Sequence, residues 1–205
     1  MVKVKGMWEY LNTDKFWAEL SPNDEVMHLY DSDESLVASL SGFVFSGIRA
    51  SEAVVVIATK SHLDLLDAKF RDGKSPFSLT VAGKYLPFVA ETTLTHFMFN
   101  GMPDDTLFAY MLDSFLSRSR RMKKRVRIFA EMDALLLDDG NRPATEALDA
   151  LWNKYRLLDQ FCLLRAFPND EVSRAITSRT KLRNKHLIMI GGETSQENVF
   201  FKRFA

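Results

Sequence analysis

The sequence has little cysteine, no net charge and no long apolar run, and each shortage excludes a class of protein. Its one cysteine, Cys162, has no partner for an intrachain disulfide, which excludes a disulfide-stapled scaffold. Lysine plus arginine and aspartate plus glutamate both number 27, so no global field draws the chain to nucleic acid or an anionic membrane. The longest fully apolar run, Ala53 to Ala58, is too short for a bilayer, and the N-terminus has no signal-peptide core. We therefore expect a cytoplasmic protein with neither a membrane nor a nucleic-acid partner.

The composition is that of a globular domain with a sizeable core, with 46% hydrophobic and 26% charged residues. Apolar strand patterns alternate with helical patterns of ten or more residues. The strands are expected at 26–30, 52–59, 77–81, 85–90, 126–131 and 161–167. This alternation predicts an α/β fold in three αβα layers, in which helices cover both faces of a mainly parallel sheet.

Capping serines and glycines indicate where the predicted helices begin and end. Ser32 is expected to cap a helix that Gly47 ends, and Ser61 to cap a second helix that Gly73 ends. Further helices are expected at 92–99, 105–124, 134–137 and 143–158, with a turn at 101–104. We divide the chain into an N-terminal extension over 1–25 that packs on the core, an α/β domain over 26–190 and a tail over 191–205. The apolar tail is expected to pair as a strand or to cover a neighbour.

One segment imitates a nucleotide-binding motif without its context. Residues 68–75, AKFRDGKS, fit a relaxed phosphate-loop pattern. A phosphate loop leaves a strand and opens a helix, whereas this segment ends a helix and runs into Pro76. We interpret it as a glycine C-cap beside a solvated lysine. The connection after strand 52–59, ATKSHLD, contains no glycine and is too short to cradle a phosphate.

Five stretches of the chain together resemble a known family. They are SGFVFSGIRASEAVVVIATKSHL, GKYLPFVAETTLTHFMFNGMP, VRIFAEMDALLLDDGN, ALDALWNKY and FCLLRAFP, in that order. The chain is similar, from about Trp17 to Pro168, to the MEDS family, the sensory domain named for methanogen and methylotroph regulators. The resemblance implies a KaiC/RecA-like fold without Walker motifs. It also implies a module that senses a small molecule beside a histidine kinase or a helix-turn-helix output domain.

The chain departs from the family pattern at several positions. Ala130 stands where the family has glycine before Glu131, and Arg165 stands where the family has cysteine. Glu25 replaces a family histidine near the first strand, with His28 shifted toward Tyr30. If those family residues contact a ligand, this chain binds a different one or none.

Ligands of open parallel sheets bind at the carboxyl ends of the strands, so we collect the polar residues expected there. The candidate ligand-binding residues are Thr59, Ser61, His62, Glu91, Glu131 and Arg165. Glu131 ends an apolar strand where a Walker B acid would lie, and it is either a buried structural acid or a ligand contact. His62, in the first turn of a helix, is expected to be neutral. A buried Arg165 needs a carboxylate, and the predicted topology makes Glu131 its partner.

Other chemistry has weaker support. No pair of histidines shows metal-ligand spacing, and we predict no cofactor and no metal. The basic run from Arg118 to Arg127 is interpreted as the solvated end of a long helix, with docking to an acidic partner as the alternative.

Three functions remain open. The leading hypothesis is a stand-alone sensory or signalling module that holds a small polar ligand at the strand ends. It would act on a separate protein, a histidine kinase or a transcription regulator, and homo-oligomerisation stays open. The alternatives are an enzyme with Glu131 as general base and His62 or Arg165 holding an anionic substrate, or a purely structural interaction domain.

Overall fold

The computed structural model describes residues 13–72, 84–121, 124–170, 172–175, 187–192 and 199–203. The helices are α1 (Thr13–Ala18), α2 (Asp33–Arg49), α3 (Lys60–Asp72), α4 (Ala90–Thr95), α5 (Asp105–Arg121), α6 (Met132–Asp138) and α7 (Arg142–Asp159). The strands are β1 (Glu25–Tyr30), β2 (Ala53–Ala58), β3 (Tyr85–Val89), β4 (Met98–Phe99), β5 (Met102–Pro103), β6 (Val126–Ala130), β7 (Cys162–Pro168), β8 (Leu187–Gly192) and β9 (Val199–Arg203).

Seven of the strands form one sheet in the order β3-β2-β6-β7-β1-β8-β9. All neighbours in it are parallel except β8 and β9, which are antiparallel. The predicted mainly parallel sheet is therefore confirmed, and β9 is the strand that the apolar tail was expected to form. β4 and β5 make a separate two-stranded hairpin.

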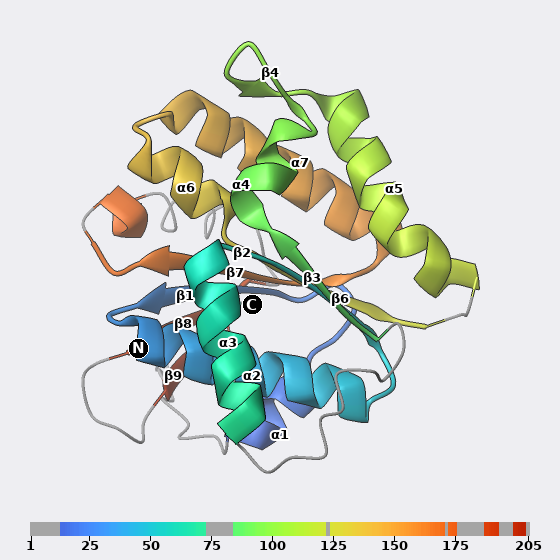
Figure 1. Ribbon diagram of the computed structural model, residues 1–205, viewed down its shortest axis with the longest axis vertical. Helices are drawn as coiled ribbons and strands as arrows, with labels where there is room; N and C mark the ends of the chain where they lie inside the picture. The colour runs from blue at the N-terminus through green and yellow to red at the C-terminus, as the bar shows by residue number, and fades with distance from the viewer. Residues whose placement is uncertain are drawn as a thin grey trace, which may run out of the picture.

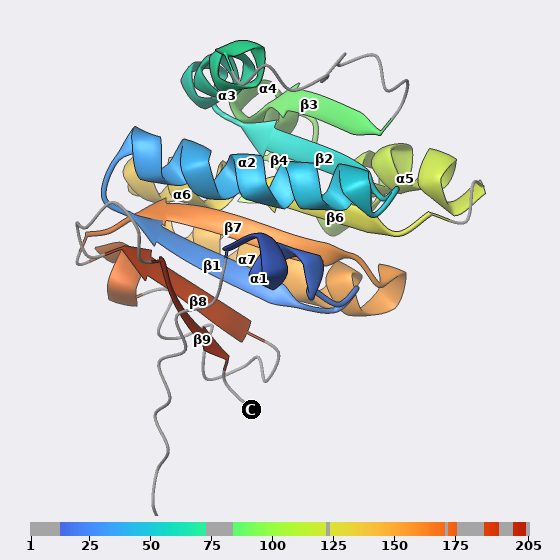
Figure 2. The same cartoon turned by 90° about the horizontal axis from the view of Figure 1, so that it is seen from below.

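Helices cover both faces of the sheet, which confirms the three-layer αβα architecture (Figures 1 and 2). One face carries α1, α2 and α3, and Figure 2 shows α2 crossing it. The opposite face carries α4, α5, α6 and α7. Every residue of β2 is buried, as expected for a strand that is covered on both faces.

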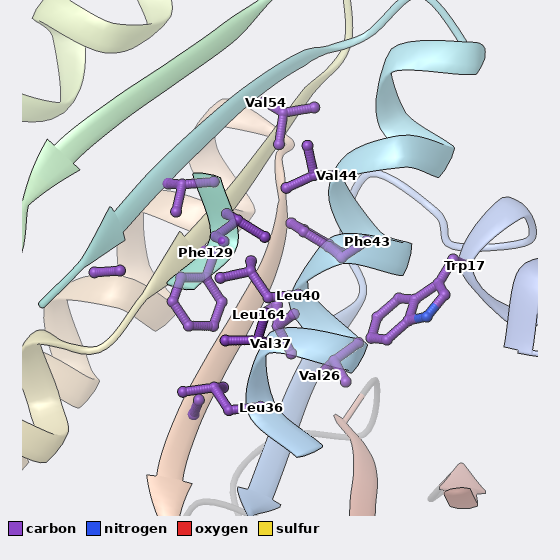
Figure 3. Packing of buried hydrophobic residues seen from close by; sticks show 14 of the residues in the cluster. Trp17, Val26, Leu36, Val37, Leu40, Phe43, Val44, Val54, Phe129 and Leu164 are labelled. Carbon is purple, nitrogen blue, oxygen red and sulfur yellow. The ribbon is translucent and has the colours of Figure 1, made fainter. Parts of the chain in front are cut away.

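The core beneath α2 shows why this helix lies against the sheet. Its inward side chains, among them Leu40 and Phe43, pack with Val54, Phe129 and Leu164 from three neighbouring strands (Figure 3). Ser32 caps the helix in a capping box, as predicted. Trp17 of α1 packs edge-on against Phe43, with the ring centroids 5.6 Å apart.

Gly47 does not end α2, contrary to the prediction, because the helix continues to Arg49. The glycine instead permits close packing. A Cβ atom on it would lie 2.7 Å from Val54 Cγ2 and 3.0 Å from Arg127 Cδ. Glycine is favoured both where a helix ends and where a helix packs closely against neighbouring side chains. The sequence alone did not distinguish these two reasons.

Several other boundaries differ from the prediction. The helix expected at 92–99 is α4, which ends at Thr95, and the turn expected at 101–104 is the second half of the β4–β5 hairpin. Gly73 and the strand expected at 77–81 lie outside the described residues. Within the part of the chain that is described, no helix is both long enough and apolar enough to cross a bilayer.

The basic run from Arg118 to Arg127 is not uniformly solvated. Arg127 is 2% exposed, and its guanidinium donates to the Glu52 carboxylate and, at 2.7 Å, to the carbonyl oxygen of Trp17. Arg125 Nε lies 3.0 Å from the same carboxylate. The prediction was wrong for Arg127 because this residue belongs to β6, where the side chain points beneath α2 rather than along the end of α5.

Candidate functional site

The candidate site lies where β2 and β6 end side by side. β2 continues into α3 on one face of the sheet, and β6 continues into α6 on the other. Two neighbouring parallel strands whose helices leave on opposite faces form a switch point, where α/β proteins bind their ligands. Four of the predicted site residues meet at this point: Thr59, Ser61, His62 and Glu131.

Glu131 is the centre of this group. It directly follows β6 and is 2% exposed. Although it precedes the first residue of α6, its side chain makes no cap hydrogen bond to that helix. Its carboxylate instead crosses to the neighbouring strand, where Oε2 accepts a 2.9 Å hydrogen bond from the backbone N–H of Thr59. A buried carboxylate therefore satisfies a free amide at the start of α3.

His62 links Glu131 to α2. Its Nδ1 atom lies 2.7 Å from Glu131 Oε1, and its Nε2 atom lies 3.2 Å from Asp33 Oδ1. The approach to Glu131 is bent, so this contact is a close ion pair without an aligned hydrogen bond. Interaction with the Glu131 carboxylate, opposed by burial, raises the pKa of His62 to about 9. The prediction of a neutral His62 is wrong because two carboxylates outweigh the unfavourable field of one helix terminus.

Two hydroxyl groups form the solvent-facing side of this group of residues. Thr59 Oγ1 lies 3.1 Å from Ser61 Oγ and accepts a 3.3 Å hydrogen bond from the backbone N–H of His62. Thr59, rather than the predicted Ser61, thus supplies the side-chain cap of α3, because the helix begins at Lys60. Ser61 is exposed. Its hydroxyl is available to a small molecule that enters from solvent.

The site also includes residues that sequence reasoning missed. Tyr30, the last residue of β1, lies edge-on to His62 with ring centroids 6.0 Å apart, and to His28 at 6.1 Å. Burial, with the negative charge of Glu131 and Asp33, raises the pKa of Tyr30 above its usual range, so its hydroxyl keeps its proton. Burial lowers the pKa of His28 to about 4, so His28 is neutral. The sequence could have indicated Tyr30, because Tyr30 ends a strand and the rule that selected Thr59 was its position at a strand end.

Glu91 does not join this group in the described structure. It is exposed, in the first turn of α4, on the opposite face of the sheet from α3. The pattern placed it correctly after β3. However, α4 and α3 leave their strands on different sides, so a shared strand-end position does not bring Glu91 to His62.

Arg165 is also elsewhere, and the expected contact with Glu131 is wrong. Its guanidinium lies under α6 and α7, where it pairs with Glu25, with Asp133 at 3.1 Å and with Asp149 at 2.6 Å. Successive side chains of a strand point to opposite faces, and Arg165 points to the α6 and α7 side. The carboxylate that the buried arginine required is present, but three residues supply it.

No group of three His, Cys, Asp or Glu side chains is placed to hold a metal ion within the described ranges. Both ring nitrogens of His62 face carboxylates, and the raised pKa of the ring keeps it charged at neutral pH. A protonated imidazole has no lone pair to donate to a metal. The arrangement is thus a hydrogen-bonding and charge-paired site.

Comparisons with known proteins agree with this architecture. A family model described as MEDS: MEthanogen/methylotroph, DcmR Sensory domain matches residues 26–181. Among solved structures, the chain is similar to the KaiC-like protein PH0186 from the hyperthermophilic archaeon Pyrococcus horikoshii OT3. That match has a TM-score of 0.58 and 16% sequence identity, over 89% of this chain and 80% of the other. No curated protein matches the chain.

Proposed function

The chain belongs to the MEDS family of sensory domains, and from that premise we propose that it binds a small polar ligand where β2 and β6 end. Membership gives the sensory role, and the KaiC-like neighbour gives the fold. The ligand would contact Ser61, Thr59, His62 and Glu131, and the domain would pass its state to a separate output protein. One observation carries the proposal: a charged pair, Glu131 with His62, lies at the switch point beside exposed hydroxyl groups.

The Glu131 carboxylate supplies a mechanism for sensing. It joins the end of β6 to the start of α3 through Thr59 and His62, and no covalent turn joins those two segments. A ligand that offers its own acceptor to Thr59 or His62 competes with Glu131 for these donors. Its binding would release α3 from β6, and a shift of α3 is a change that an output protein could read.

The same contacts argue against a nucleoside triphosphate as the ligand. Neither Asp31–Ser32, between β1 and α2, nor Thr59, between β2 and α3, contains a glycine, so neither connection can wrap a phosphate chain. At α3 the anion position is already filled by Glu131. A phosphate would have to displace this carboxylate and then lie beside Asp33.

An enzymatic role has less support. Glu131 as general base would have to give up the ion pair with His62 and the hydrogen bond from Thr59. His62 carries a proton at neutral pH, because its pKa is raised to about 9, and a protonated imidazole cannot accept a proton from a nucleophile such as Ser61. Binding uses both groups in the states that they already hold.

The proposed output partner is a histidine kinase or a transcription regulator. The support is membership of the family alone, which is a family of sensory domains. A response that travels through α3 needs a partner that contacts this helix. Its solvent face includes Leu65, which is 43% exposed.

Thermal unfolding with simple probes tests the proposal. Ethanolamine, acetate and glycerol represent cationic, anionic and neutral polar ligands, and Mg-ATP represents nucleotides. We expect a saturable rise in the Tm of the wild-type chain with at least one of the three small probes and none with Mg-ATP at micromolar concentration. The rise should disappear in Ser61→Ala and Glu131→Gln and persist in Leu65→Ala, an exposed change on the same helix. The proposal is overturned if none of the small probes raises the Tm, or if Ser61→Ala keeps the full effect.

A further inference from the structure

A surface on the opposite face of the sheet from α3 has the features of a contact between two copies of the chain. Of the eight large hydrophobic residues that are exposed in the described ranges, four lie between positions 99 and 110. They are Phe99 at 65%, Met102 at 40%, Leu107 at 41% and Tyr110 at 71% exposure. The first two lie on the β4–β5 hairpin and the other two on the first half of α5.

Beside these residues lies a groove of about 570 Å³ between β3, α4 and α5. Phe88 and Phe115 lie in it with ring centroids 4.3 Å apart, and Leu107 and Tyr110 line it from α5. Figure 1 shows the hairpin projecting beyond the neighbouring helices. The surface therefore combines a protruding aromatic knob with a hollow that can receive one.

The hairpin is anchored well enough to present Phe99 in one position. Asn141 donates a 2.8 Å hydrogen bond from its side chain to the carbonyl oxygen of Gly101, and the backbone N–H of Asp104 donates to Phe97 at 2.8 Å. Gly101 has a φ of +76°, which suits glycine at the tip of the hairpin. Because these bonds already fix the backbone of the hairpin, ordering that backbone adds little to the entropic cost of binding.

We propose that two copies of this chain pair through this surface, with the hairpin of each copy in the α4–α5 groove of the other. A two-fold contact requires the knob and the groove to lie on opposite sides of the axis. Leu107 and Ser114 lie three residues before and four residues after Tyr110 on the same side of α5, and both line the groove. Leu107 is about 4.5 Å along the helix axis toward the hairpin, and Ser114 is about 6 Å in the other direction. Two antiparallel α5 helices that cross near Tyr110 thus bring hairpin to groove twice.

The exposed area and the charges fit a second copy. The four side chains alone expose roughly 400 Å² of largely apolar surface, about half of the ~800 Å² that each partner contributes to a standard interface. Charges of both signs border the surface, as in the 2.6 Å pair between Asp105 and Lys154. The net charge of the chain is zero, so an identical copy is not repelled.

Sedimentation velocity of the full chain over a range of concentrations tests this pairing. We expect the wild type to dimerise, and we expect Phe99→Ser and Tyr110→Ser each to weaken dimerisation about tenfold or more. Leu158→Ser is the matched control, because Leu158 is 68% exposed on α7 outside this surface, and it should dimerise like the wild type. The Tm and the circular dichroism of diluted samples should match among all four chains.

Cysteine cross-linking locates the axis independently. The native Cys162 is buried, so Tyr110→Cys introduces an accessible thiol close to the proposed two-fold axis. Mild oxidation should give a covalent dimer for Tyr110→Cys and none for Leu158→Cys. A wild type that stays monomeric at every concentration overturns the proposal and assigns the surface to a different partner. A dimer that survives Phe99→Ser and Tyr110→Ser unchanged overturns this interface.

Discussion

The carboxylate of Glu131 accepts a hydrogen bond from the backbone N–H of Thr59, 2.9 Å away, so the residue that follows β6 satisfies the start of the helix that follows β2. Helix starts in α/β folds commonly hold a ligand anion with these same free amides. In this chain the anion is part of the protein. Any ligand that binds here must therefore replace or accommodate a buried carboxylate that already has two partners, Thr59 and His62.

Replacing this carboxylate by an amide should destabilise the chain. Glu131→Gln keeps the shape of the side chain and can still accept from Thr59, but it removes the charge that faces His62. We expect a loss of about 2 kcal/mol in the free energy of unfolding at pH 7, because the imidazolium remains largely buried with Asp33 as its other partner. Urea unfolding measures this loss in the free energy of unfolding. Glu91→Gln, an exposed change at another strand end, is the control and should stay within about 0.5 kcal/mol of the wild type.

The raised pKa of His62 predicts a loss of stability in mild alkali. The pKa rises from 6.5 in a model peptide to about 9 in the fold. Since the folded value is higher, the stabilisation is complete below pH 6.5 and disappears as the pH rises through 9. We expect about 1 to 2 kcal/mol over this window, less than the whole displacement would give, because Asp33 is solvent-exposed and screened. Unfolding measured at intervals from pH 6 to 9.5 gives the slope.

His62→Gln separates this effect from the other titrating groups. It should remove most of the slope between pH 6.5 and 9. NMR titration of the imidazole resonances in the wild type should place His62 near 9 and His28 near 4. A His62 resonance that titrates near 6.5 would mean that the contacts with Glu131 and Asp33 do not hold in solution.

The fold could be predicted from the sequence to a large extent, because the signals for it are local. The buried run of β2, the capping serine of α2 and the alternation of strands and helices each reflect short-range patterns. The errors lie where one residue type serves two purposes. Gly47 was interpreted as a helix end, although it allows close packing with Val54. Ser61 was predicted to cap α3, although Thr59, two residues earlier, is the capping residue.

The candidate site could be predicted only in part, because it depends on which face each helix takes. Strand ends identify Thr59, His62 and Glu131 as neighbours. They do not show that Arg165 points to the opposite face or that Tyr30 reaches His62 from β1. The raised pKa of His62 depends first on Glu131 and also on Asp33, a residue 29 positions away that no local pattern connects to it.

The C-terminal strand should protect the edge of the sheet. β9 pairs antiparallel with β8, so deleting residues 193–205 exposes the backbone hydrogen-bonding groups along that edge of β8. We expect a lower Tm and a greater tendency to aggregate, measured by light scattering during heating. Identical scattering and Tm for the full-length and shortened chains would contradict the role assigned to β9.

The last prediction concerns the buried charges around Arg165, which is 1% exposed. Three carboxylates, on Glu25, Asp133 and Asp149, contact this guanidinium, and Arg156 approaches Glu25 to 3.7 Å. Arg165→Met leaves these carboxylates with one nearby cation, and we expect a loss of about 3 to 5 kcal/mol in the free energy of unfolding.

The matched variant is Asp133→Asn, which changes one of the carboxylates around Arg165. Burial, opposed by Arg165, raises the pKa of Asp133 to about 6, so the fold disfavours the charged form of this carboxyl group. Asp133→Asn keeps an acceptor for the indole N–H of Trp152, which lies 3.1 Å from Asp133, and should cost less than about 1 kcal/mol. The pKa of Asp133 is higher in the folded chain than in the unfolded chain, so protonation of this carboxyl group stabilises the fold. The wild type loses that stabilisation as the pH rises from about 4 to 6. The stability of Asp133→Asn relative to the wild type should therefore increase across that window.

The same variants test whether the two buried charge groups are independent. Arg165 lies under α6 and α7, and His62 lies under neither, so Arg165→Met should leave the pKa of His62 near 9. Glu131→Gln should lower that pKa, because it removes the largest contribution that raises it. Both values come from NMR titration of chains that remain folded at low temperature. If Arg165→Met shifted the pKa of His62 in either direction by as much as Glu131→Gln does, Arg165 and Glu131 would act as one network, and the assignment of Glu131 to a separate ligand site would be lost.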